Sequence, residues 1–304
     1  MITILGANGA IANQLAHELL AQKKPVRLVS RNPKPLNRGE VLVKANLLDA
    51  TQVNAAVAGS NLVYLTAGLT YSSKVWQKEW PLLMENVIRA CQLHQARLVF
   101  FDNVYAYGKV NGPMTESTPY NPCSKKGEVR AQIANFLQQE MGNQQLIARA
   151  ADFIGQSPMS FLSIMVFERL AQGKSAQWMV DPNQPHTYTY IPDTGKALDI
   201  LGSNPENFGQ VWHLPSHPNP ITGTELVNLA AQAFQTQAKI STIPKPLLYM
   251  LGWFVPVIRE SYEMLYQLDS PYHFNSQKFK NSFGDHATPI HQAIHATALA
   301  YQKP

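Results

Sequence analysis

Short apolar runs alternate with helical patterns from residue 2 to residue 149 of this 304-residue chain. The runs are rich in β-branched and aromatic residues, which is typical of buried strands. Helical periodicity fills most of the intervals, over 10–22, 51–58, about 78–94 and about 125–141. Because two parallel strands need a long crossover connection, the alternation predicts a parallel sheet covered by helices on both faces. The predicted strands are 2–5, 26–30, 41–47, 61–67, 97–102 and 145–149.

The pattern loosens after about residue 155, where prolines become frequent. We therefore predict an α/β fold, a Rossmann-like doubly wound parallel sheet with a smaller C-terminal substrate domain. The first domain takes residues 1–155, with 186–215 returning to it, and the second takes 156–185 and 216–304. In such sheets, ligands bind beyond the carboxyl ends of the strands.

The turn after the first predicted strand reads GANGAIA and places Gly6, Gly9 and Ala12 at intervals of three. Glycines there let the backbone approach a pyrophosphate, and the helix that follows supplies N–H groups and a positive dipole. The pattern predicts a dinucleotide site formed by Gly6, Asn8, Gly9, Ala10 and Ile11. The alternative is a tight structural turn without a ligand.

The end of the second predicted strand indicates which dinucleotide is bound. A site for NAD usually has an acidic residue there, which accepts hydrogen bonds from the ribose hydroxyls. Here the sequence is VSRNPKP, with Arg31 and Lys34 and no carboxylate. Because a guanidinium pairs well with phosphate, Arg31 favours the 2′-phosphate of NADP, and NAD is the less favoured cofactor.

Composition argues against several other classes of protein. The net charge of +5 is spread along the chain, so a nucleic-acid-binding face is not indicated. The cysteines, Cys91 and Cys123, form neither a disulfide framework nor a metal motif, and no histidine-carboxylate cluster has metal-ligand spacing. The longest apolar run, 247–258, is too short to span a bilayer and predicts a buried or lid-like helix, with a membrane-touching surface as the lesser alternative. Since the first strand begins at Ile2, we expect no signal peptide and a cytoplasmic protein.

Several motifs in order resemble the extended branch of the short-chain dehydrogenase/reductase superfamily, the NAD(P)-dependent epimerases and dehydratases. The resemblance implies a seven-stranded Rossmann-like sheet, with Thr66, Ala67 and Gly68 on the nicotinamide side and with Asn46 and Leu47 facing the adenine. The motifs are the glycine turn, LLD (47–49), VYLTAG (63–68), LVFFDNVYAYG (98–108), RAADFIG (149–155) and YTYIPDTGKAL (188–198).

The catalytic pair that the resemblance implies is missing. Active relatives carry a Tyr-x-x-x-Lys pair, in which the tyrosine moves the proton and the lysine lowers its pKa and holds the nicotinamide ribose. If Lys126 is that lysine, the tyrosine position holds Pro122; if Lys125 is, it holds Asn121. The serine or threonine that polarises the substrate is replaced by Asn103.

Three interpretations therefore remain open for the stretch around Lys126. In the first, Lys126 binds the ribose and a displaced group transfers the proton, together with Asn103 at the strand end; the candidates for that group are Asp102, Tyr105, Tyr107 and Tyr120. In the second, the protein binds NADP without turnover, as a redox sensor. In the third, the stretch is only a helix start capped by Ser124.

The remaining expectations concern the substrate and partners. Asp152 falls where relatives carry a substrate-contacting residue, and His213 follows a predicted strand near the crevice; both are candidate substrate contacts, with structural roles as the alternative. The resemblance implies a carbonyl or hydroxyl compound, with a sugar nucleotide less favoured because only Arg169 and Lys174 are basic in 156–188. We expect a small-molecule substrate and no nucleic-acid or membrane partner, and a homodimer is left open.

Overall fold

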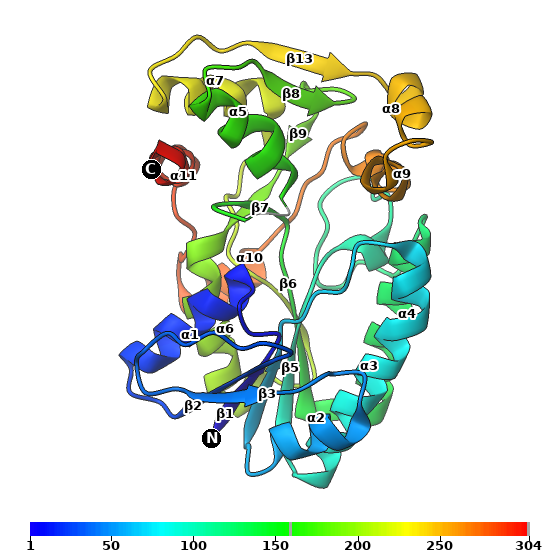
Figure 1. Cartoon of the computed structure of the whole chain (residues 1–304), viewed down its shortest axis with the longest axis vertical. Helices are drawn as coiled ribbons and strands as arrows, with labels where there is room; N and C mark the ends of the chain where they lie inside the picture. The colour runs from blue at the N-terminus through cyan, green and yellow to red at the C-terminus, as the bar shows by residue number, and fades with distance from the viewer. Residues whose placement is uncertain (158–159, 303–304) are drawn as a thin grey trace. The chain divides into compact units, whose positions relative to one another are not determined.

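The computed structural model describes residues 1–157 and 160–302, and the chain divides into two units (Figure 1). The first unit comprises Met1–Gly108, Pro119–Ala150 and Pro192–Leu214, and the second comprises Lys109–Thr118, Ala151–Ile191 and Pro215–Pro304.

These bounds differ from the predicted ones: the chain leaves the first unit at Ala150 instead of 155, the first unit ends at Leu214 instead of 215, and two further differences are larger. The chain returns to the first unit at Pro192 instead of 186, and Lys109–Thr118 belongs to the second unit, although the sequence analysis placed it in the first. The second difference has a physical cause in the backbone of Met114. Its N–H donates to the carbonyl of His273 and its carbonyl accepts from the N–H of Asn275, so this segment pairs with the C-terminal part of the chain.

A seven-stranded parallel sheet forms the centre of the first unit, in the order β11-β6-β5-β4-β1-β2-β3. This confirms the predicted Rossmann-like fold class. The edge strand β3 is shorter than predicted, because the N–H of Asn46 donates to the side chain of Gln52 and so leaves the ladder. The strands are β1 (Ile2–Leu5), β2 (Val26–Ser30), β3 (Val41–Lys44), β4 (Leu62–Leu65), β5 (Arg97–Asp102), β6 (Gln145–Arg149) and β11 (Val211–His213).

Helices cover both faces of this sheet (Figure 1). Helices α2 (Ala50–Val57), α3 (Ser73–Leu93) and α4 (Lys125–Met141) bury their apolar residues against one face. Helices α1 (Ala10–Ala21) and α6 (Ile191–Ser203) cover the other face. Single turns lie at η1 (Tyr105–Tyr107), η2 (Gly142–Gln144) and η4 (Pro205–Asn207).

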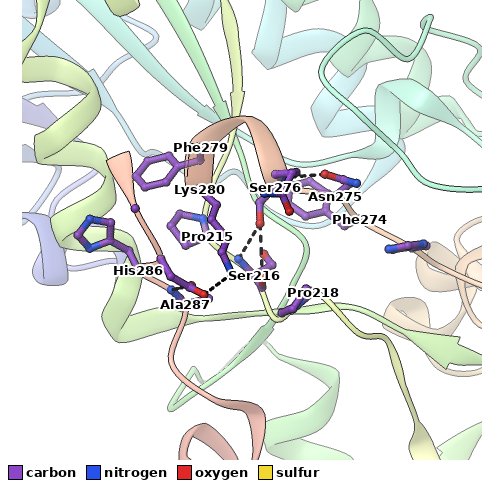
Figure 2. Close-up of a pocket in the computed structure, with 14 residues that line it drawn as sticks. Pro215, Ser216, Pro218, Phe274, Asn275, Ser276, Phe279, Lys280, His286 and Ala287 are labelled. Carbon is purple, nitrogen blue, oxygen red and sulfur yellow. Dashed lines mark hydrogen bonds and ion pairs between the residues drawn. The ribbon is translucent and has the colours of Figure 1, made fainter. Parts of the chain in front are cut away.

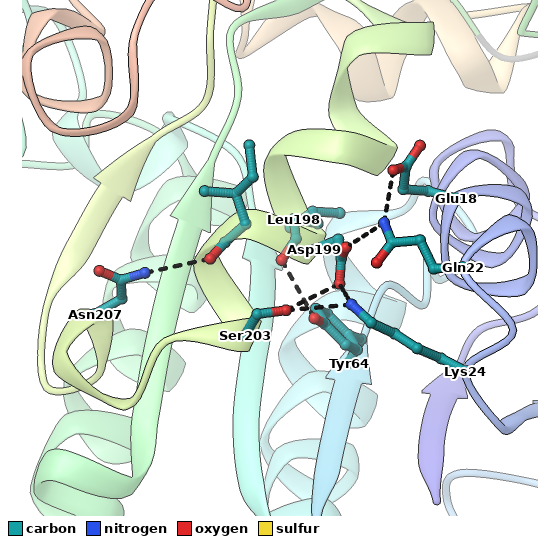
Figure 3. A network of polar contacts seen from close by, with 9 residues as sticks. Glu18, Gln22, Lys24, Tyr64, Leu198, Asp199, Ser203 and Asn207 are labelled. Carbon is teal, nitrogen blue, oxygen red and sulfur yellow. Dashed lines mark hydrogen bonds and ion pairs between the residues drawn. The ribbon is translucent and has the colours of Figure 1, made fainter.

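A polar network joins α6 to α1 and to the sheet (Figure 3). The carboxylate of Asp199 pairs with the Lys24 ammonium at 2.5 Å and accepts from the Gln22 amide at 2.7 Å. The hydroxyl of Tyr64, on the buried strand β4, donates to the carbonyl of Leu198 at 3.2 Å, and burial raises the pKa of this phenol far above its ordinary value. The network thereby fixes the returning segment to the first unit.

The second unit is built from short elements around its own apolar core. Trp178, Phe167, Leu226 and Ile294 are among the buried residues of this core. Its strand pairs are β7 (Asp152–Ile154) with β10 (Tyr188–Tyr190), β8 (Ala176–Met179) with β13 (Ile240–Ile243), and β9 (Pro185–His186) with β12 (Ile221–Thr222). Its helices and turns are η3 (Ser163–Phe167), α5 (Glu168–Ala171), α7 (Gly223–Ala233), α8 (Lys245–Leu251), α9 (Pro256–Tyr262), η5 (Leu265–Gln267), α10 (Gln277–Phe283) and α11 (Ile290–Gln302).

Candidate functional site

The turn between β1 and α1 is shaped by close backbone packing at Gly6. Gly6 has φ of +107°, and a Cβ there would lie 2.4 Å from the backbone nitrogen of Ala67. The N–H groups of Gly6 and Ala7 both donate to the carbonyl of Val29, which ties the turn to β2. The positive φ and the close contact with Ala67 therefore require a glycine at position 6, whether or not a ligand binds.

Gly9, at the N-cap of α1, is different. Its φ is −68°, and the nearest atom to a Cβ built there is the Gly6 carbonyl oxygen, at the ordinary distance of 3.5 Å. The packing of the protein therefore does not require a glycine at this position. Because Gly9 has no side chain to cap α1, the first N–H groups of the helix have no side-chain acceptor, and such groups suit an anion.

Asn8 has a structural task in the structure. It adopts a positive φ of 77°, and its amide donates to the carbonyl of Asn32 at 2.8 Å and accepts from the N–H of Lys34 at 2.9 Å. The side chain thus connects the glycine turn to the loop after β2. Asn8 therefore helps to position the segment that contains Arg31.

A cavity of about 270 Å³ lies at the carboxyl ends of β1, β2, β3 and β4. Its volume is close to the lower end of the range for small-molecule sites, about 300–1,000 Å³. Asn8, Ala10, Ile11 and Lys126, which were also predicted to bind the cofactor, are not among the described residues that line it. The predicted residues that do line it are Gly6, Gly9, Arg31, Asn46, Leu47, Thr66, Ala67 and Gly68.

Several residues of the cavity wall were not predicted from the sequence. Leu69 directly follows Gly68, so only its position beside predicted residues indicates that it lines the cavity. Glu79 and Leu83 come from α3, and only the helical spacing of four between them would have placed them on one face. A side chain holds the loop after β3: the Leu47 carbonyl accepts from the buried side-chain amide of Asn86 at 3.1 Å.

Asp102, one of the four candidates for the displaced proton-transfer group, is buried. Only 1% of its surface is exposed. Its two carboxylate oxygens face the guanidinium groups of Arg130 at 2.8 Å and Arg149 at 3.1 Å, and both arginines are buried. Burial lowers the pKa of Arg130; at Arg149, burial is outweighed by Asp102 and nearby phenols, which raise its pKa. Asp102 is therefore a charge partner within the fold.

Tyr107 and Tyr120 belong to the same buried cluster. The Arg149 guanidinium lies 4.5 Å from the ring centre of Tyr107 and 4.6 Å from that of Tyr120. Burial raises the pKa of Tyr107 to about 12 and raises that of Tyr120, so both phenols are weak proton donors. Tyr120 lies in the loop ahead of α4, and Ser124 caps that helix by accepting from the N–H of Gly127 at 3.1 Å.

His213 also lies in this cluster. It is completely buried on β11 and shares a 2.8 Å hydrogen bond with the hydroxyl of Tyr107. That His213 contacts a substrate stays a prediction, and in the structure its hydrogen-bond partner is Tyr107. The sequence pattern VWHLP could not show this, because the partner lies 106 residues away along the chain.

An amine and two phenols come together at the start of α4. The ammonium of Lys126, which is fully buried, lies 4.6 Å from the ring centre of Tyr71. The Tyr71 hydroxyl lies 3.5 Å from that of Tyr105, whose ring stacks on Trp76. The side-chain amide oxygen of Asn103 accepts from the N–H of Tyr105 at 3.0 Å and so fixes the turn η1. Tyr71 was missed, because nothing in the sequence links it to Lys126.

In the second unit, the Asp152 carboxylate is partly exposed and lies 3.0 Å from Nε2 of the buried His186. The imidazole is stacked between the rings of Tyr188 and Tyr272, with centroid distances of 4.7 and 4.0 Å. Asp152 therefore pairs with His186, and part of its side chain stays exposed.

A second cavity, lined by residues of the second unit, has a volume of about 50 Å³ (Figure 2). Ser216 and Ser276 meet in its wall, where the Ser216 N–H donates to the Ser276 hydroxyl at 3.2 Å. Lys280 and Asp285 form an ion pair beside it. Since small-molecule sites occupy about 300–1,000 Å³, this cavity holds a few waters and not a substrate.

The described helices include none with the length and apolar character that a bilayer crossing requires. Histidine, cysteine, aspartate and glutamate side chains do not gather in threes as metal ligands anywhere in 1–157 or 160–302.

Comparison with known proteins places the fold. Residues 6–138 match a family model described as NAD(P)H-binding. The chain is similar to a UDP-glucose 4-epimerase from Thermus thermophilus in complex with NAD, with 16% identity, a TM-score of 0.80, and 99% of this chain and 98% of that chain covered. It is similar to a dTDP-glucose 4,6-dehydratase from Bacillus anthracis in complex with NAD, with 16% identity, a TM-score of 0.80, and coverages of 99% and 96%. A search of curated protein sequences gave no match.

These matches confirm the predicted resemblance at the level of the fold. Almost the whole chain follows the fold of NAD-bound epimerase and dehydratase structures, and the NAD(P)H-binding match spans the glycine turn and most of α4.

Proposed function

We propose that this chain, with an NAD(P)H-binding domain on an epimerase and dehydratase fold, is an NADP-dependent oxidoreductase or epimerase-like enzyme acting on a carbonyl or hydroxyl compound. The single observation that carries the proposal is the meeting of Lys126 with Tyr71, whose hydroxyl lies 3.5 Å from that of Tyr105. The chain has no tyrosine four residues before Lys125 or Lys126, yet its fold brings the buried ammonium of Lys126 to a tyrosine pair that is far from it in sequence.

Cofactor binding is assigned to the cavity at the strand ends. The N–H groups at Gly9, Ala10 and Ile11 would hold the pyrophosphate, Arg31 the 2′-phosphate, and Thr66–Gly68 the nicotinamide side. When bound, the nicotinamide supplies hydride exchange. Lys126 is assigned to the nicotinamide ribose.

Proton transfer is assigned to Tyr105. Asp102, Tyr107 and Tyr120 are engaged around Arg149, whereas Tyr105 is half-buried and its hydroxyl contacts that of Tyr71. The hydroxyl of Tyr105 would donate the proton to a substrate oxygen, and Lys126 places a positive charge beside the tyrosine pair. Asn103 positions Tyr105 through the turn.

The substrate class is supported by the similar structures and limited by this chain's basic residues. The similar proteins are named for UDP-glucose and dTDP-glucose chemistry, which favours a sugar nucleotide. In this chain, however, the Arg169 guanidinium donates to the carbonyl of Ser175 at 2.7 Å, and Lys174 bonds Gln172. Both are thus occupied locally, so a substrate panel should also contain carbonyl compounds without a diphosphate.

We expect Tyr105→Phe to lower turnover by about 100- to 10,000-fold, the usual contribution of a general acid. Turnover is measured as NADPH oxidation with the panel of sugar nucleotides and simple carbonyl compounds, and NADPH affinity is measured separately. Tyr120→Phe is the matched control and should keep the parent rate. Full activity in Tyr105→Phe together with loss in Tyr120→Phe would contradict the assignment.

We expect Arg31→Glu to remove about 1–3 kcal/mol of the preference for NADP(H) over NAD(H), because a charge-assisted pair with the 2′-phosphate becomes a repulsion. Arg31 is exposed and lines the cavity. Calorimetric titration of both dinucleotides measures the change. Arg38→Glu makes the same charge change at an exposed residue that is not part of the cavity wall, and should leave the preference intact. Equal affinity of the parent for both dinucleotides would refute the role of Arg31.

A second candidate function is an NADP(H)-binding redox sensor without turnover. The observation that favours it is the complete burial of Lys126, four residues after Pro122, where active relatives carry the tyrosine. Tight NADPH binding without oxidation of the cofactor on the whole panel would support the sensor.

A further inference from the structure

The turn between α8 and α9 carries a dense set of exposed apolar side chains. The segment Pro246–Ile258 contains no charged residue. Trp253 is 66% exposed and Phe254 is 81% exposed. We call this segment the α8–α9 tip; its other exposed large apolar residues are Leu247, Tyr249, Met250, Val255 and Val257. The sequence analysis predicted a buried or lid-like helix here, and the burial expected for these residues is wrong.

The α8–α9 tip is an ordered structure. The N–H of Trp253 donates to the carbonyl of Met250 and that of Val255 to the carbonyl of Leu251. A Cβ at Gly252 would lie 3.2 Å from the Cα of Arg259, so the two helices approach closely at this glycine. Figure 1 shows α8 and α9 side by side. The hydrogen-bonded turn therefore holds the aromatic side chains outward.

We propose that the α8–α9 tip inserts into the headgroup region of a lipid bilayer that contains anionic lipids. Exposed apolar patches of this kind mark interaction surfaces, and tryptophan and tyrosine are favoured at the boundary between headgroups and acyl chains. This inference is independent of the proposed function and replaces the expectation that the protein has no membrane partner.

Charge favours an anionic bilayer as the partner. At the edges of the tip, Arg259 is exposed, whereas Glu260 and Glu263 are half-buried and Lys245 is paired with Asp269. The whole chain carries a net charge of +5, which attracts it to an anionic surface. An interface with a protein partner normally has an apolar centre and a polar rim that fixes the docking position. The α8–α9 tip has thirteen consecutive uncharged residues and therefore little polar rim.

Vesicle flotation tests the proposal. The full chain should float with vesicles of phosphatidylcholine and phosphatidylglycerol, and less with phosphatidylcholine alone. The double variant Trp253→Ser with Phe254→Ser loses two inserted aromatic side chains. Its partition coefficient between water and vesicles should therefore be about tenfold lower than that of the parent, or lower still. Leu93→Ser, at a residue 68% exposed on α3, is the matched control and should bind like the parent.

Tryptophan fluorescence of the unmodified chain gives a second measurement that does not depend on a variant folding. Trp253 is exposed, while the other four tryptophans are buried. Brominated lipids should therefore quench the emission that comes from Trp253. Three results would overturn the proposal: no flotation with either vesicle, no quenching by brominated lipid, or a parent dimer that the double variant converts to a monomer. The buried tryptophans are Trp76, Trp80, Trp178 and Trp212.

Discussion

The Asp102→Asn variant is expected to lose about 3–5 kcal/mol of unfolding free energy, because removal of one charge from a buried ion pair leaves its partners uncompensated. Here one carboxylate faces two buried guanidinium groups, those of Arg130 and Arg149. Since a domain is typically stable by about 5–15 kcal/mol, this loss is a large part of the total. Chemical denaturation with urea measures it.

Glu85→Gln is the matched control for that experiment. Glu85 pairs with Arg89 one turn along α3, and both side chains are substantially exposed. Solvent screens such a pair, so its loss should cost about 0.3–0.5 kcal/mol. If Asp102→Asn has the stability of the parent but has lost turnover, Asp102 acts in catalysis and its assignment to the fold is wrong.

The Gly6→Ala variant is expected to lose about 2–4 kcal/mol of unfolding free energy, since the added methyl group is both strained and crowded. The φ of +107° disfavours any side chain, and the Cβ would lie 2.4 Å from the backbone nitrogen of Ala67, which cannot rotate away. Denaturant midpoints of variant and parent give the difference.

Gly9→Ala is the matched variant at the other glycine of the turn. Its Cβ meets no close contact, so the stability should stay near that of the parent. Dinucleotide affinity should fall at least about tenfold, or 1.4 kcal/mol, because the methyl group occupies the space assigned to the pyrophosphate. If Gly9→Ala binds NADP+ like the parent, the pyrophosphate does not lie on this turn.

Features that depend on neighbours in sequence were predicted well. The glycine turn, five of the strands and the 125–141 helix rest on local periodicity, and the structure has them at or near the predicted bounds. The cavity residues could be grouped because the carboxyl ends of parallel strands must meet at one edge.

Features that depend on distant pairs were not predicted. The burial of Asp102 could not be predicted, because it depends on the pairing with Arg149, which lies 47 residues later in the chain. Tyr71 meets Tyr105 across 34 residues, and neither periodicity nor a motif couples them. The assignment of Lys109–Thr118 failed for the same reason, because its partner is the backbone around Phe274.

A crystal structure of the chain with NADP+ bound tests the central claim most directly. The account predicts the pyrophosphate at the N–H groups of Gly9 and Ala10, the 2′-phosphate within hydrogen-bond distance of Arg31, and the nicotinamide beside Thr66–Gly68. Density for the dinucleotide outside the cavity at the carboxyl ends of β1 to β4, or a 2′-phosphate without contact to Arg31, would contradict the account.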